Sequence, residues 1–123
     1  MARRVLARSG MLTLSAASAL SGLSTQMLSR RRRANRVLAL PLLGARVPNY
    51  RYPAFQFEAD VHEVMPQFLD LFGRGRSWQL FDLLTRPDPL LEGRIPLELL
   101  RCGKKSDVLR VAMLAAMLEQ GAY

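Results

Sequence analysis

Cysteine is nearly absent from this sequence, since Cys102 is the only one among 123 residues. A single thiol excludes an internal disulfide and a zinc site built from several cysteines. It is also typical of a reducing compartment, which favours a cytoplasmic protein. His62 is likewise the only histidine, and neither residue has an evident partner for catalysis. We therefore expect no enzyme activity, no cofactor and no metal site.

Acidic side chains are missing from the first half of the chain. Residues 1–57 contain ten arginines and no Asp or Glu, whereas residues 58–123 contain eight basic and ten acidic side chains. The net charge of +8 therefore arises entirely in the first half. Such segregation is typical of a segment that binds a polyanion, followed by a segment with another task. We predict one domain over 1–57 and a second over 58–123.

Long apolar runs are also missing, because no stretch reaches the roughly 18 apolar residues that span a bilayer. The stretch 11–23, MLTLSAASALSGL, is short and contains four hydroxyl side chains. The arginines at 30–33 follow it, and positive charges after an apolar segment disfavour its translocation. We expect no membrane association. An Arg- and Ser-rich, acid-free start also fits an organellar transit peptide, so removal of the first ~30 residues remains an alternative.

The same stretch predicts two short helices joined by a glycine turn. Thr13 or Ser15 can cap a first helix over 16–20, and Gly22 can adopt the left-handed backbone of the turn. Ser24 can cap a second helix over 25–33. This is the layout of a helix-turn-helix, whose second helix lies in the major groove of DNA.

The second of these helices carries the residues that we predict to contact DNA. Its polar side chains can bond base edges, and its arginines would mainly meet phosphates. A solvated basic face, or a helix packed on a partner, would explain the same pattern. The predicted DNA-binding residues are Ser24, Thr25, Gln26, Ser29, Arg30, Arg31, Arg32 and Arg33.

Two apolar runs, 37–43 and 50–57, predict a β-hairpin after these helices. A hairpin in this place can form the wing of a winged helix-turn-helix, with Arg46 and Arg51 near phosphates. Because Pro53 cannot donate a hydrogen bond within a sheet, we expect its strand at an edge. A hairpin that merely covers the core is the alternative.

From residue 58 onward the spacing of apolar residues predicts helices only. Pro66 suits the first position of a helix that Gly73 would end. Ser77 can cap the next helix, Pro96 can open a third, and Ser106 can cap a last one that runs to about residue 120. The predicted fold class is therefore mainly α, with a short N-terminal helix-turn-helix, a small wing-like β-hairpin and a C-terminal helical bundle.

The last predicted helix is apolar on nearly all sides, because Val108, Leu109 and 111–118 form an almost unbroken apolar series. A helix of this kind is either buried in its own bundle or has one side on a second molecule. The pattern alone leaves both possibilities open.

Several spaced motifs in the second half occur in a fixed order. An aromatic helix motif, Trp78-x-x-Phe81, precedes a proline turn at 87–89, the element LLEGRIPLELL over 90–100, and Gly103. In this order they resemble the toxin-binding domain of Xre/MbcA/ParS-type antitoxins, whose pattern contains LxGxxPLxxL. The preceding YPAFQF, at 52–57, is similar to the segment that links a helix-turn-helix to this domain in some members. The opening module is shorter than the usual Xre-type bundle.

The resemblance implies a bacterial type II antitoxin, whose cognate toxin is a RES-domain protein that consumes or transfers parts of NAD. It implies that the C-terminal part packs on the toxin. The N-terminal part would dimerise and bind promoter DNA, which gives a homodimer or a larger hetero-oligomer with the toxin. A stand-alone DNA-binding regulator that dimerises through its C-terminal helices is the alternative. The expected toxin contacts are Leu97, Leu100, Arg101, Leu109, Met113, Met117, Gln120 and Tyr123.

Overall fold

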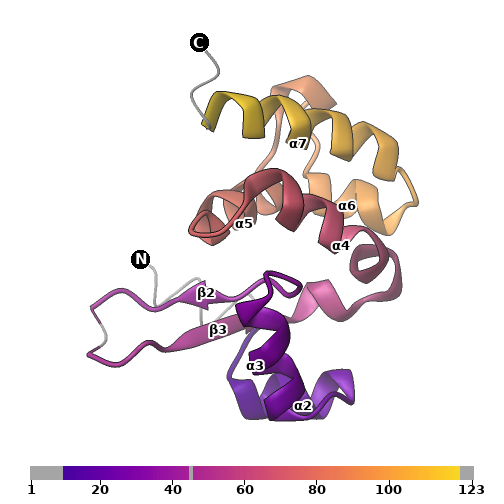
Figure 1. Ribbon diagram of the computed structural model, residues 1–123. Coiled ribbons are helices and arrows are strands. Elements are labelled where there is room, and N and C mark those ends of the chain that lie inside the picture. The colour runs from indigo at the N-terminus through magenta and orange to yellow at the C-terminus, as the bar shows by residue number, and fades with distance from the viewer. Residues whose placement is uncertain (1–9, 45, 120–123) are drawn as a thin grey trace.

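The computed structural model describes residues 10–44 and 46–119, which form helices α2 to α7 and a small three-stranded antiparallel sheet (Figure 1). Helices α2 and α3 lie at one end of the molecule and α7 lies at the other, with α4 and α5 between them. The predicted fold class, mainly α with a small hairpin, is confirmed. Within the described residues, no helix is both long and apolar enough to cross a membrane.

Helix α2 (Leu14–Ser21) begins at Thr13, whose hydroxyl accepts a hydrogen bond from the amide of Ala16 at 3.2 Å. A hydroxyl in this place satisfies one of the amides that a first helical turn leaves unpaired. The helix is longer than the predicted 16–20, because the cap is Thr13 and not Ser15. The expected first helix is therefore confirmed with an earlier start.

The turn after α2 is held by two serines and a glycine. Gly22 has a φ of 78°, a left-handed conformation that glycine adopts without strain. The Ser18 hydroxyl donates to the carbonyl of Leu23 at 2.6 Å and so closes the turn. The hydroxyl oxygen of Ser24 accepts a hydrogen bond from the amide of Met27 at 3.0 Å and so caps α3 (Thr25–Arg33). The helix-turn-helix predicted from the sequence is present.

The sheet contains β1 (Met11–Leu12), β2 (Leu40–Pro41) and β3 (Tyr50–Pro53), in the order β1-β3-β2. Both pairings are antiparallel, so β2 and β3 form the predicted hairpin. The strands are shorter than the runs 37–43 and 50–57. Strand β1 was not expected, because two residues are too short to show an alternating pattern.

Pro53 lies at the end of the central strand, so the expectation of an edge strand was wrong. Continuing the register of β2 and β3 by two residues would pair Leu38 with Pro53, which has no N–H. The side chain of Gln56 takes that place. Its Oε1 accepts from the amide of Leu38 and its Nε2 donates to the carbonyl of Leu38, both at 2.8 Å. Nε2 also donates to the carbonyl of Pro53 at 3.1 Å.

This arrangement turns the chain away from the sheet. The four residues after β3 form a 3-10 turn, η1 (Ala54–Phe57), so the expectation that the strand continues to Phe57 was wrong. The side chain of Gln56 is buried, with an exposed fraction of 1 %, and all of its polar atoms are hydrogen-bonded. A strand would carry this amide away from Leu38, whereas the tight turn holds it there.

Helix α4 (Ala59–Phe72) is the centre of the helical body and contains Pro66 in its interior. Our expectation that Pro66 opens a helix was therefore wrong. The helix continues through the proline because its buried side chains recur every three or four residues on both sides of it. It ends at Gly73 as predicted. Those buried side chains are Val61, Val64, Met65, Phe68, Leu69 and Phe72.

Helix α5 (Ser77–Thr85) begins at its expected capping serine, and α7 (Lys105–Glu119) begins one residue before its own. Ser77 is the first residue of α5, and Ser106 lies within the first turn of α7, so neither serine is the cap. In α5 the residue before the helix, Arg76, makes no side-chain capping bond. Packing of the apolar faces therefore sets these starts more than hydroxyl capping does.

The segment that resembles the antitoxin motif forms a short turn and a short helix. The turn η2 (Pro89–Leu91) is capped by Asp88, whose carboxylate accepts from the amide of Leu90 at 2.8 Å. Helix α6 (Pro96–Arg101) begins at its proline as predicted. This segment packs against α7 and α5.

Two hydrophobic cores meet at the segment 37–40. Val37 and Ala39 belong to a small core beneath the helix-turn-helix, whereas Leu38 and Leu40 belong to the main core of α4 to α7. Alternate residues of an extended chain point to opposite sides, so one segment can serve both cores. The two predicted domains are therefore packed through a shared, extended segment rather than a free linker.

Replacing Gln56 with Leu leaves the amide and carbonyl of Leu38 without partners inside the protein. Each unpaired buried group costs about 1–3 kcal/mol, so we expect the free energy of unfolding to fall by about 2–5 kcal/mol. Urea unfolding followed by circular dichroism measures it. The control Gln67→Leu changes an exposed glutamine on α4 and should shift the free energy by about 0.5 kcal/mol or less. If both substitutions lower the free energy of unfolding equally, the hydrogen bonds of Gln56 do not stabilise the fold.

Candidate nucleic-acid and partner-binding surfaces

Helix α3 presents part of the predicted DNA-binding set to solvent. Thr25, Gln26, Arg30 and Arg33 are exposed, and Ser29 is half-buried. The hydroxyl of Ser24 caps the helix and is therefore occupied by the amide of Met27. Thr25 and Gln26 lie in the first turn of the helix, which is the part that contacts base edges in helix-turn-helix proteins, whereas Arg30 lies in its last turn.

Arg31 and Arg32 lie differently from the other two arginines of the run. The guanidinium of Arg32 stacks over the ring of Tyr50 at 4.2 Å from its centroid, which ties α3 to the hairpin. Arg31 is half-buried and lines a cavity on the other side of the helix. The sequence placed all four arginines on phosphates, but the structure leaves only Arg30 and Arg33 fully free to reach them.

Burial beneath the same helix changes the titration of a tyrosine. The pKa of Tyr52 is raised above its ordinary value because burial disfavours the phenolate. The nearby guanidinium of Arg32 opposes this effect without cancelling it. Tyr52 is therefore a neutral core residue.

A basic groove of about 300 Å³ runs from the end of α3 to the loop before α5. Arg33 and Arg74, which are far apart in the sequence, lie on this groove, and no Asp or Glu lines it. Asn35 holds the two sides together, since its Nδ2 donates to the carbonyl of Leu69 at 3.0 Å. The groove is lined by Arg32, Arg33, Asn35, Val37, Ala39, Pro41, Tyr50, Arg74, Gly75 and Ser77.

The sequence did not identify Arg74 as part of this surface. Arginine alternates with glycine over 73–76, which predicted only a loop between helices. The relevant contact is tertiary, because α4 brings the loop beside α3, and no local pattern records that. The only local sign that this loop could bind an anion is that arginine alternates with glycine in it.

At the other end of the molecule, α7 exposes a row of large apolar side chains. Met113, Leu114, Met117 and Leu118 have exposed fractions of 52 %, 47 %, 56 % and 79 %. Their spacing of three and four residues places them on one side of the helix. We call these four residues the apolar face of α7.

The opposite side of α7 packs into the main core. Val108, Val111, Ala112 and Ala116 are buried there. Burial in its own bundle therefore holds for one side of the helix, and contact of the other side with a second molecule stays a prediction. One side closes the bundle, and the other is exposed in the single chain, where isolated large apolar residues are common but a row of four is not.

The predicted toxin contacts are distributed over three kinds of environment. Leu97 and Leu100 are buried in the main core, and Leu109 is half-buried against it. Met113 and Met117 lie together on the apolar face of α7. Gln120 and Tyr123 lie outside the described residues.

Arg101, also predicted to contact the toxin, is paired within its own chain. Its Nε and Nη2 donate to the two carboxylate oxygens of Glu58 at 2.8 and 2.7 Å. This hydrogen bonding lowers the pKa of Glu58 and raises the pKa of Arg101. The pair joins α6 to the start of α4, and both side chains remain nearly half exposed.

His62 and Cys102, the remaining residues with reactive side chains, do not lie in a catalytic cluster. His62 is exposed on α4, and its Nδ1 lies 3.2 Å from the carbonyl of Gln56. Cys102 is exposed at the end of α6. No group of three or more His, Cys, Asp or Glu within residues 10–44 and 46–119 could hold a metal ion.

Comparison with known proteins gives no relative for this chain, since no protein family, no curated protein and no solved structure matches it. Its function must therefore be inferred from the chemistry of its surfaces and from its sequence motifs.

Replacing Arg101 with Gln should produce a pH-dependent loss of stability. Because the pKa of Glu58 is lowered in the folded protein, the pair stabilises the fold above the unfolded value of 4.5. That stability is lost as the pH falls through the folded pKa. For a pair this exposed we expect a loss of at most about 1 kcal/mol at pH 7. Urea unfolding at a series of pH values from 7 down to 2 should show the difference from wild type shrink as the pH falls below 4.5. A difference that stays constant over the whole series would exclude the ion pair as its cause.

Proposed function

We propose that this protein is a DNA-binding antitoxin that contacts operator DNA through α3 and a toxin through the apolar face of α7. The observation that carries the proposal is the separation of these two surfaces. The basic surface of α3 lies at one end of the molecule and α7 at the other (Figure 1). One chain can therefore engage DNA and a protein at the same time.

The chemistry of the first surface suits duplex DNA. Thr25, Gln26 and Arg30 offer the donors and acceptors that read base edges in the major groove. Arg33 and Arg74 line the acid-free groove beside them and suit the phosphate backbone. The hairpin of β2 and β3 flanks α3 on the same side as a wing would.

The chemistry of the second surface suits a protein partner. Aliphatic and thioether side chains on one helical face are the usual content of a helix-in-groove contact. The resemblance of the segment 78–103 to antitoxin toxin-binding domains supports a RES-type toxin as that partner. In this function the protein acts in the cytoplasm and dimerises, or forms a larger assembly with the toxin, when it represses its operon.

A stand-alone transcriptional regulator is the second candidate. The apolar face of α7 favours it too, because the same row of side chains on two copies could form a symmetric dimer. Co-expression with the product of the neighbouring gene separates the two functions. A RES-type neighbour whose toxicity is abolished by this chain supports the antitoxin. A neighbour of another kind, or one equally toxic with and without this chain, would contradict it.

Exchanging Arg30 and Arg33 together for Gln should weaken binding to promoter DNA and flatten its salt dependence. Removing one arginine from a phosphate reduces the slope of log K against log salt by about 0.9. Fluorescence anisotropy with labelled promoter DNA at several salt concentrations measures both quantities. Arg94→Gln is the control, since Arg94 is an exposed arginine beside α6 at the other end of the molecule. The proposal fails if this control weakens binding as much as the double substitution.

Replacing Met113 and Met117 with Asp should abolish toxin neutralisation and leave the fold intact. Both side chains are more than half exposed, so we expect the free energy of unfolding to change by about 1 kcal/mol or less. Growth after co-expression with the toxin reports neutralisation, and DNA binding reports the fold. The matched control is Leu20→Asp, which places a charge on an exposed leucine of α2. Full neutralisation by the double variant would exclude the apolar face of α7 as the contact.

A further inference from the structure

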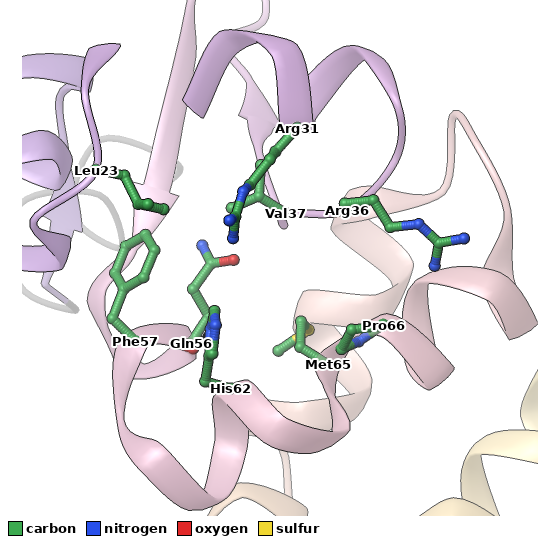
Figure 2. A pocket seen from close by; sticks show the side chains of 9 residues that line it. All are labelled: Leu23, Arg31, Arg36, Val37, Gln56, Phe57, His62, Met65 and Pro66. Atoms are coloured by element: carbon green, nitrogen blue, oxygen red, sulfur yellow. Dashed lines mark hydrogen bonds between the residues drawn. The ribbon is translucent and has the colours of Figure 1, made fainter. Parts of the chain in front are cut away.

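A cavity of about 290 Å³ lies between α3, η1 and α4, on the side of α3 away from the basic groove (Figure 2). We call it the α3–α4 cavity. Apolar walls with a few polar groups are typical of small-molecule sites, and this volume lies at the small end of their range. The apolar part of the wall is formed by Leu23, Val37, Phe57, Met65 and Pro66.

Arg31 brings a positive charge into this cavity. Figure 2 shows its side chain reaching from α3 into the cavity toward Gln56, whereas that of Arg36 points away. Arg36 is paired with Asp70 at 3.2 Å. The guanidinium of Arg31 makes no hydrogen bond and no ion pair with the residues that the structure describes. The lining of the cavity contains no Asp or Glu that could neutralise it.

The two other polar residues of the wall are already engaged. The amide of Gln56 is occupied by its three hydrogen bonds to Leu38 and Pro53. The Nδ1 of His62 faces the backbone carbonyl of Gln56, which can only accept, so Nδ1 is the donor. Neither group offers a negative partner to Arg31. Among the residues that the structure describes, the cavity therefore has a mainly apolar wall and one cation, Arg31, without a partner.

We propose that the α3–α4 cavity binds a small carboxylic acid with an aromatic or branched aliphatic body. The carboxylate pairs with Arg31, because a guanidinium offers two parallel N–H donors to the two oxygens of a carboxylate. The body of the acid packs on Phe57 and Met65. Larger polyanions such as nucleotides do not fit, since they need more volume and more than one free cation. Binding of the acid requires neither DNA nor the toxin.

The test uses three fluorinated probes that share one body. 4-(Trifluoromethyl)benzoate carries the carboxylate, 4-(trifluoromethyl)benzyl alcohol is neutral, and 4-(trifluoromethyl)benzylamine is positive. Fluorine NMR titration of the full chain, without DNA or toxin, gives a Kd for each. We expect the acid to bind at least about tenfold more tightly than the alcohol, as one charge-assisted pair provides. The amine should bind most weakly.

Arg31→Gln should remove the preference for the acid while leaving the weak affinity for the alcohol. The variant Arg31→Lys should still bind the acid more tightly than the alcohol, because a positive charge remains at this position. The control Arg30→Gln removes an exposed arginine one residue away, outside the cavity lining, and should leave all three Kd values unchanged. Circular dichroism of each variant verifies that it is folded.

Three results would overturn the proposal. The acid could fail to bind the wild type, or it could bind no better than the alcohol. Arg30→Gln could also reduce the affinity as much as Arg31→Gln, which would indicate loose attraction to the arginine run as a whole. Amide shifts on addition of the acid provide a separate readout. They should centre on Leu23, Phe57 and His62, and shifts centred on α7 would place the acid elsewhere.

Discussion

The side-chain amide of Gln56 is the interaction on which the joining of the two halves depends. Its Nε2 gives the carbonyl of Leu38 the donor that Pro53, lacking an N–H, cannot supply, and its Oε1 accepts from the amide of Leu38, both from a fully buried position. Because Leu38 is fixed, the side chains of the segment 37–40 alternate between the two cores. The helix-turn-helix and the helical body are thereby held in one orientation. An apolar side chain at position 56 would be as well suited to burial but would leave these backbone groups unpaired.

Local patterns were sufficient for the helix-turn-helix and for the class of the fold. Hydroxyl caps and Gly22 predict the turn and α3 (Thr25–Arg33) to the residue, and α2 with a start two residues too late, because capping and left-handed turns are local effects. The errors occurred where tertiary packing decides. Pro66 was placed at a helix start, yet packing on both sides of it carries α4 through the proline. Pro53 was placed at an edge, since nothing local shows that a glutamine three residues later replaces its missing donor.

The candidate site residues follow the same division between local and tertiary effects. Arg31 was expected on the DNA surface and instead lines a cavity, whereas Arg74 was expected only in a loop and instead lines the basic groove. Which arginine faces the interior and which faces the groove depends on where α4 and its following loop lie. Helix α4 supports both places, because its middle forms one wall of the α3–α4 cavity and its C-terminal loop lines the groove. A displacement of α3 relative to α4 would therefore change the cavity and the groove together, whereas the apolar face of α7 lies outside that contact.

The uneven placement of charge gives the chain a large electric dipole along its length. In the field of any polyanion, a molecule of this kind rotates during diffusion so that its arginine-rich end leads, and the number of productive encounters rises. The trailing end is then α7, which turns its methionines and leucines away from the polyanion and toward the solvent. Under the proposed function this leaves α7 open to the second protein both before and after the first contact with the polyanion.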